Sequence, residues 1–344
     1  MPTPTPAAPA TADLSYIDPA LTLLLAAASL AAYNDFSTGT FATPAGYRFL
    51  ARFQGWDGVI GSLGTAEKYG LIFQSTAPGT NQLLIAFRGT SSHLDIFEDA
   101  FLDKRAFVPA ANAAQVPASV LVEAGFYEVY SLAGTMPQSM QQTLFELLDS
   151  LKPTELLVTG HSLGAALSQL FSLDVAVSRP GLKVTNLNFA SPRVGDAAWG
   201  QLCDTLGVSA TITRVINYHD AVPDYPLADL GYVSVGAQFQ TAFRAYHLLE
   251  ENPLSNHSLA NLQTVLTHAL ALTPQVWADG TFTDAEFGIW MQSLAVPALS
   301  RGELLARLQE VYALAHPAPH VALPTQVRRA TNGQVVPRTA APVG

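Results

Sequence analysis

The feature that most constrains the fold is a glycine-flanked pentapeptide between two apolar segments of different periodicity. Gly160-His161-Ser162-Leu163-Gly164 follows the segment 155–159, which contains the short apolar run 156–158, and precedes the stretch 163–175, whose apolar residues recur at helical spacing. A short apolar run bounded by turn residues is typical of a buried strand, and the spacing after it is typical of a helix packed on a sheet. The order strand, tight turn, helix places Ser162 on a sharp turn at the end of a buried strand.

The same alternation of apolar runs and helical stretches extends over most of the chain. Continuous apolar runs indicate strands buried on both faces, and their alternation with helices favours an α/β fold. We therefore predict a mostly parallel central sheet with helices on both faces. The further runs are 71–73, 83–87, 184–190 and 212–216, and a further helical stretch is 138–151.

The composition is unusually apolar. Hydrophobic residues make up 49% of the 344 residues, charged residues make up 13%, and the net charge is −10. Disordered chains combine high charge with few apolar residues, and nucleic-acid-binding domains carry a basic patch. Neither class fits a chain whose 17 Lys and Arg are spread along its length, and a single cysteine, Cys203, excludes an internal disulfide.

One segment, 19–33, is apolar enough to raise the question of a membrane. It is shorter than the ~20 residues that a spanning helix needs, and no basic residue precedes Arg48, as an export signal would require. We predict a buried alanine-rich helix with Asp18 as its cap and Pro19 in its first turn. A membrane anchor and an atypical export signal are the alternatives.

A serine on a strand-to-helix turn is the arrangement of a catalytic nucleophile. Glycines two residues before and after Ser162 allow the backbone segments to approach closely. The helix N-terminus and the Leu163 N–H would then help to hold an oxyanion. His161 is too close along the chain to act as the base, and we expect it to support the turn.

Several motifs, in this order, resemble those of the fungal-type (class 3) lipases. The similarity covers about residues 21–266 and implies the α/β-hydrolase fold and a serine ester hydrolase. In the fourth motif Ala190 stands in place of the usual glycine. The motifs are 85–90 (Ile-Ala-Phe-Arg-Gly-Thr), 125–127 (Gly-Phe-Tyr), 160–165 (Gly-His-Ser-Leu-Gly-Ala), 190–196 (Ala-Ser-Pro-Arg-Val-Gly-Asp) and 231–236 (Gly-Tyr-Val-Ser-Val-Gly).

The catalytic acid should follow Ser162 in the chain, because α/β hydrolases order their triad as serine, carboxylate, histidine. Asp220 lies just past the run 212–216, where sites of α/β sheets are built. The resemblance implies the same residue, since the family places its acid in an Asp-x-Val-Pro context. Asp224 is the alternative.

The catalytic base should follow the acid. The segment 254–259 resembles the histidine loop of the family and precedes the predicted helix 261–272, so His257 is the candidate. His247, ten positions earlier, is the alternative. For the oxyanion hole, Leu163 is one donor, and the resemblance implies Thr90 as the other. Arg88 is expected to be a structural hydrogen-bonding residue at the end of its strand.

A lid is expected over residues 91–120. Leu94, Phe97 and Phe101 share one helical stripe, which is typical of an amphipathic helix. The resemblance implies a mobile lid over an acyl groove, and a helix simply packed on the domain is the alternative. The charge-free stretch 107–121 looks like an insertion relative to the family and could widen that lid.

The expected domain organisation has four parts. Residues 1–14 are a disordered leader and 15–272 the catalytic domain. Residues 273–316 are a helical C-terminal extension, because 283–286 and 300–303 resemble capping boxes. Residues 317–344 are a flexible tail.

The resemblance implies a carboxylic ester hydrolase, foremost a triacylglycerol lipase, which acts through an acyl-enzyme as a peripheral protein at a lipid–water interface. Phospholipase A1, a feruloyl-type esterase, a short-chain esterase and a non-catalytic lipid-binding relative are the alternatives. The sequence contains no metal-binding or phosphate-loop motif. We therefore expect no cofactor, no metal in the chemistry and no nucleic-acid partner. No signal peptide is recognisable, and both a secreted and a cytoplasmic protein are compatible with the sequence.

Overall fold

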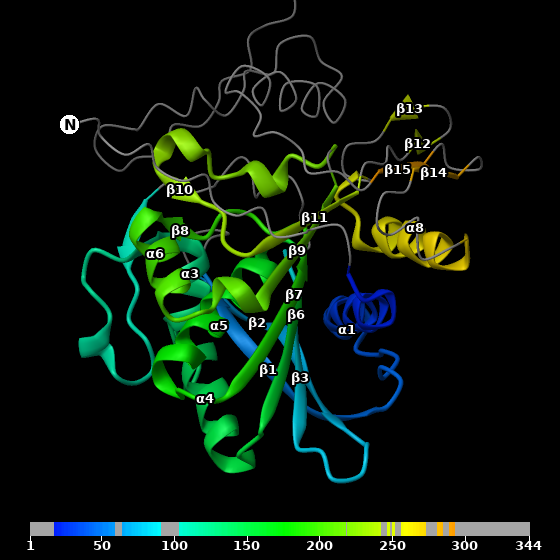
Figure 1. The fold of residues 1–344 in the computed structure, drawn as a ribbon. Helices are drawn as coiled ribbons and strands as arrows, with labels where there is room; N and C mark the ends of the chain where they lie inside the picture. The colour runs from blue at the N-terminus through cyan, green and yellow to red at the C-terminus, as the bar shows by residue number, and fades with distance from the viewer. Residues whose placement is uncertain are drawn as a thin grey trace, which may run out of the picture.

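A seven-stranded sheet forms the centre of the molecule in the computed structural model (Figure 1). The structure describes residues 17–58, 64–90, 103–217, 219–241, 246–247, 250–251, 256–272, 281–284 and 289–292. The strand order is β1 (Tyr47–Asp57), β2 (Thr65–Ser75), β3 (Gln82–Phe87), β6 (Glu155–Gly160), β7 (Lys183–Phe189), β9 (Ile212–Asn217) and β11 (Ala237–Thr241).

The sheet is parallel from β3 to β11 and antiparallel from β1 to β3. The parallel strands bury both faces, which is why they appear in the sequence as continuous apolar runs. This confirms the predicted mostly parallel sheet. Strand β1 was not predicted, because it lies at the sheet edge and alternates polar with apolar residues instead of forming an apolar run.

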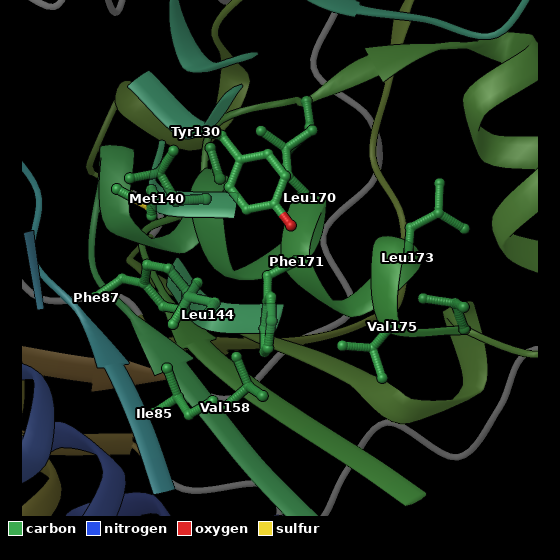
Figure 2. Close-up of a cluster of buried hydrophobic side chains, with 14 of the residues drawn as sticks. Ile85, Phe87, Tyr130, Met140, Leu144, Val158, Leu170, Phe171, Leu173 and Val175 are labelled. Carbon is green, nitrogen blue, oxygen red and sulfur yellow. The ribbon is translucent and has the colours of Figure 1, made fainter. Parts of the chain in front are cut away.

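Helices cover both faces of the sheet (Figure 1). On one face lie α3 (Ala124–Ser131), α4 (Met140–Leu151), α5 (Leu163–Ser178) and α6 (Ala197–Thr205). Figure 2 shows the core on this face, where Phe87 and Val158 of the sheet pack against Phe171 of α5. The other face is covered by α1 (Pro19–Thr38) and α8 (Leu259–Leu272), which form a second core.

Helix α1 is the segment that raised the membrane question. Its length and composition alone would allow it to cross a membrane. In the structure it instead packs on the sheet through small residues such as Ala28 and Ala31, as predicted. Asp18 caps it by accepting hydrogen bonds from the N–H groups of Ala20 and Leu21, and Pro19 is its first residue.

Smaller elements complete the described part of the chain. A four-stranded sheet has the order β10 (Tyr232–Val233), β8 (Gly195–Asp196), β5 (Leu121–Glu123), β4 (Lys104–Ala106). Strands β12 (Tyr246–His247) and β13 (Glu250–Glu251) form an antiparallel pair. Four single-turn 3₁₀ helices are η1 (Ala113–Gln115), η2 (Ser209–Thr211), η3 (Val222–Asp224) and η4 (Ala228–Leu230).

Part of the segment predicted as a lid is bound to the body of the protein. The Ala110 N–H donates to Asp174 Oδ1 (2.8 Å), and the Ala111 N–H donates to Ser178 Oγ (2.8 Å). Both partners lie in the C-terminal half of α5, at the opposite end of that helix from Ser162. Residues 107–112 therefore do not widen a lid over Ser162, and this part of the prediction is corrected. The predicted lid residues Leu94, Phe97 and Phe101 lie outside the described residues.

The predicted helical extension is also corrected in part. Strands β14 (Thr281–Asp284) and β15 (Ile289–Gln292) pair antiparallel where 273–316 was expected to be helical. Both segments are rich in β-branched and aromatic residues, which favour strands. The capping-box pattern at 283–286 is a shorter and weaker signal. The rest of this extension, the leader 1–14 and the tail 317–344 lie outside the described residues.

Candidate active site

Ser162 stands at the junction of β6 and α5 in a strained backbone conformation. Its φ is +59° and its ψ is −129°, a backbone conformation that residues other than glycine rarely adopt. The Ser162 N–H donates to the Phe189 carbonyl (3.0 Å), and His161 pairs with Phe189 as an isolated parallel bridge. The neighbouring strand β7 therefore holds the turn in place. Ser162 is buried, and its Oγ hydrogen-bonds to no residue that the structure describes.

Three glycines make the close packing around this serine feasible. A Cβ on Gly160 would lie 2.2 Å from the Gly164 oxygen, and one on Gly164 would lie 2.5 Å from the Arg88 oxygen. A Cβ on Gly89 would lie 2.9 Å from the Ser162 Cβ. All three distances are shorter than real Cβ contacts allow, so each position requires glycine.

The two candidate oxyanion donors flank the serine. Strands β3 and β6 pair in parallel with Phe87 opposite Gly160, so the residues after β3 lie beside the turn. Thr90 follows Gly89 there, and Leu163 is the first residue of α5. The backbone thus brings Thr90 and Leu163 to the same edge of the sheet as Ser162.

Arg88 has a structural role at the end of β3, as predicted. Its guanidinium is buried, donates to the carbonyls of Lys68 and Gly89 (both 2.6 Å) and pairs with Glu67. It also lies 3.7 Å from the centre of the Phe36 ring. Each of the three guanidinium nitrogens therefore has a partner within the scaffold.

Asp220 and His257 come together although 37 residues separate them. His257 Nδ1 lies 2.6 Å from Asp220 Oδ2, and both side chains are buried. The other carboxylate oxygen accepts from the Val222 N–H (3.0 Å). Because an ionised carboxylate can only accept, Nδ1 of the neutral imidazole carries the proton and Nε2 carries the basic lone pair.

This pair lies against the serine turn. The rings of His161 and His257 have centroids 4.6 Å apart, and His161 Nε2 lies 2.8 Å from the His257 carbonyl oxygen. Asn217, at the end of β9, donates to the Asn256 carbonyl (3.0 Å) and fixes the histidine segment to the sheet. The structure therefore gathers Ser162, Asp220 and His257 at the carboxyl ends of β6 and β9.

The alternative residues are placed differently. Asp224 Oδ1 pairs with Arg193 Nη2 (3.1 Å). Arg193 Nη1 also donates to the Pro226 carbonyl (3.0 Å). Burial lowers the pKa of Arg193 to about 10, still high enough to keep it charged at neutral pH. His247 lies in β12, which pairs with β13.

Sequence reasoning missed one residue that contacts the site. The Tyr33 hydroxyl, on α1, lies 2.8 Å from His161 Nδ1. Tyr33 is 128 residues from His161 in the chain, and no local motif surrounds it. The sole signal is that it ends the apolar run 19–33.

Comparisons with known proteins agree with this architecture. The family described as lipase (class 3) matches residues 84–230. Phospholipase A1-Igamma3, chloroplastic, from Arabidopsis thaliana is 30% identical over 170 residues, which are 43% of this chain and 31% of that protein. Phospholipase A1 EG1, chloroplastic/mitochondrial, from Oryza sativa subsp. indica is 27% identical over 250 residues, which are 67% of this chain and 54% of that protein. The chain thus spans about half or less of the length of these curated relatives.

Solved structures show the same fold. The Lip2 lipase from Yarrowia lipolytica has a TM-score of 0.51 at 21% identity and covers 71% of this chain and 88% of its own. Lipase II from Rhizopus niveus has a TM-score of 0.50 at 21% identity and covers 64% of this chain and 78% of its own. The predicted α/β-hydrolase fold is confirmed.

Proposed function

We propose, from the premise that residues 84–230 of this chain belong to the class 3 lipase family, that the protein hydrolyses carboxylic esters of lipids. The observation that carries the proposal is the buried contact of 2.6 Å between His257 and Asp220, set against the turn that bears Ser162. A nucleophile on a strained turn, with an imidazole whose tautomer is fixed by a carboxylate, is the arrangement that acyl transfer requires.

The first half-reaction forms an acyl-enzyme. Ser162 Oγ attacks the ester carbonyl carbon, and His257 Nε2 takes the hydroxyl proton. The negative charge that develops on the carbonyl oxygen is stabilised by the N–H groups of Leu163 and Thr90. The bond to the alcohol oxygen then breaks, and His257 transfers its proton to that oxygen. Asp220 stabilises the imidazolium while it exists.

The second half-reaction regenerates the enzyme. Water attacks the acyl carbon, and His257 Nε2 takes one of its protons. The bond to Ser162 Oγ breaks, the proton returns to that oxygen, and the carboxylic acid leaves. Every proton therefore passes through one nitrogen, whose basicity depends on the contact between His257 Nδ1 and Asp220.

Triacylglycerol is the substrate class that the resemblance to the class 3 lipases implies. Phospholipid is the second candidate, favoured by relatives that are named phospholipase A1. We propose that the protein binds the lipid–water interface as a peripheral protein, because Leu94, Phe97 and Phe101 give the predicted lid segment an apolar stripe.

The decisive experiment measures the hydrolysis of p-nitrophenyl esters from C2 to C16 by wild type and Ser162→Ala. We expect turnover by wild type and a loss of kcat of roughly 10⁶-fold in the variant, as for a nucleophile that acts within a triad. Ser131→Ala, at the end of α3, is the matched control and should keep wild-type activity.

Four outcomes would change the proposal. Wild type that turns over no ester would indicate the non-catalytic lipid-binding relative. Full activity in Ser162→Ala would move the nucleophile elsewhere. Among active outcomes, a higher kcat/KM on triacylglycerol emulsions than on phosphatidylcholine vesicles supports the first substrate class, and the reverse supports the second. A maximum at C2–C4, with no increase when the ester forms droplets, would indicate an esterase.

A further inference from the structure

Two hydrogen bonds and one close approach link three segments that the proposed chemistry needs. Gly89 lies against the Tyr33 phenol oxygen, because a Cβ built on Gly89 would be only 2.4 Å from that oxygen. The Tyr33 hydroxyl contacts His161 Nδ1 (2.8 Å), and His161 Nε2 contacts the His257 carbonyl oxygen (2.8 Å). Gly89 precedes the candidate oxyanion donor, His161 precedes the nucleophile, and His257 is the base.

The direction of each bond follows from chemistry. A carbonyl oxygen only accepts, so His161 Nε2 must carry a proton toward His257. In the neutral ring Nδ1 then accepts, and the Tyr33 hydroxyl must donate to it. Burial raises the pKa of Tyr33, so the hydroxyl keeps the proton that this bond needs. Each of the two hydrogen bonds therefore has one donor and one acceptor.

We propose that Tyr33 and His161 are positioning residues, which hold the oxyanion segment, the nucleophile turn and the base loop in mutual register. The inference rests on the proposed ester hydrolysis and deepens it. Neither residue touches the reacting atoms in this scheme. His161 acts on His257 through its backbone and by packing on its ring, and Tyr33 acts through His161 and Gly89.

The arrangement matters because these segments are far apart in the sequence, so that non-covalent contacts must hold them in position. Gly89 comes from the end of β3, His161 from the end of β6, and His257 from the segment before α8. Tyr33 comes from α1, whose alanine-rich face packs on the sheet. A displacement of about 1 Å between catalytic groups is sufficient to lower the rate about 100-fold.

The test is a double-mutant cycle on kcat with Tyr33→Phe and His161→Leu. Tyr33→Phe removes one oxygen and retains the ring. We expect kcat to fall about 10- to 100-fold with KM within about twofold, because the defect lies in alignment and not in substrate binding. Since Tyr33 acts largely through His161, the double variant should be about as slow as His161→Leu alone.

Tyr130→Phe is the matched control. Its hydroxyl is equally engaged, donating to Asp174 Oδ2 (2.9 Å), but it lies in the core between α3 and the C-terminal half of α5 (Figure 2). This variant should lose stability in a urea titration and keep its kcat. If Tyr33→Phe lowers kcat no more than Tyr130→Phe, or if the two effects in the cycle simply add, the proposal is wrong.

A second measurement does not depend on activity. Long-range ¹H–¹⁵N NMR of the wild-type protein should show His161 as the tautomer protonated at Nε2, and Tyr33→Phe should disturb that ring while the protein stays folded. A wild-type His161 protonated at Nδ1 would overturn the network. If wild type hydrolyses no ester at all, the proposed function fails, and the NMR result still decides whether the network exists.

Discussion

At the scale of single residues, the site depends on a conformation that local preferences oppose. A positive φ at a residue such as Ser162 costs about 1–3 kcal/mol and persists only where the surroundings impose it. Here β7 accepts the Ser162 N–H, and glycines on both sides permit contacts that a Cβ would forbid. The strain is therefore supported by the packing of the sheet edge.

Substitution of the two acidic residues near the site should affect kcat in different ways. Asp220→Asn should lower kcat by about 10⁴-fold, because an amide that donates to His257 Nδ1 selects the wrong tautomer. Asp224→Asn should leave kcat within a few-fold of wild type, since Asp224 pairs with Arg193. Steady-state kinetics on a soluble p-nitrophenyl ester measures both. Comparable losses in the two variants would contradict the assignment.

The sequence contained much of this site and lacked one part of it. Chain order, the position of Asp220 after a predicted strand and the resemblance to the class 3 lipases selected two residues that the structure brings within 2.6 Å. Tyr33 could not be predicted, because its partners are far away in the chain and its role depends on where α1 packs. Long-range packing is not encoded in any local spacing.

At the scale of elements, the sequence was informative where periodicity and burial coincide. Strands β3, β6, β7 and β9 lie within the predicted apolar runs or close to them, and α4, α5 and α8 begin within two residues of the expected positions. The edge strand β1 was missed because its polar residues interrupt the pattern. The segment at β14 was misassigned because a four-residue capping pattern was weighted above β-propensity.

The C-terminus of α4 offers a stabilising substitution. Lys152 ends this helix with φ +46°, in the left-handed region, and its side chain is exposed. Lys152→Gly should raise the free energy of unfolding by roughly 0.5–1 kcal/mol, because glycine adopts this conformation without the Cβ clash. Urea denaturation measures the change. Lys152→Ala is the matched control, and an equal gain in that variant would refute the strain argument.

At the scale of the whole molecule, the apolar composition is used on both faces of one sheet. Leu170 and Phe171 of α5 belong to one core, and Leu25 of α1 and Leu262 of α8 belong to the other. A sheet buried on both sides needs apolar residues at most positions of its central strands. Two cores thus account for a large part of the apolar surplus in the described chain.

Global stability should depend on pH through Glu123. Burial, with a smaller contribution from Glu128 and Asp103, raises the pKa of this carboxyl from its ordinary value of 4.5 to about 7. The folded state therefore retains a proton that the unfolded state releases. The resulting stabilisation is complete below pH 4.5 and is lost as the pH rises through 7. Between pH 5 and 8 the loss should be about 2 kcal/mol.

The measurement compares wild type with Glu123→Gln by urea denaturation at both pH values. Wild type should lose about 2 kcal/mol more than the variant as the pH rises. Glutamine can still accept from the Phe126 N–H that Glu123 caps, so the helix keeps its cap. Glu146→Gln makes the same chemical change on the exposed face of α4 as a control. If wild type instead gains stability relative to Glu123→Gln as the pH rises, the pKa of Glu123 is not raised in the folded state and the prediction is wrong.

The second core has a consequence for the time at which the protein acquires its structure. It is closed by α1 and α8, the first and last helices of the described chain, which pack side by side. During synthesis α1 emerges first and must wait roughly 10–50 s, at 5–20 residues per second, before α8 is made. In that interval the apolar face of α1 lacks its contact with α8. The hydrogen bonds that link Tyr33 through His161 to His257 also cannot all form. The proposed catalytic centre therefore cannot be complete before the His257 segment and α8 have been made.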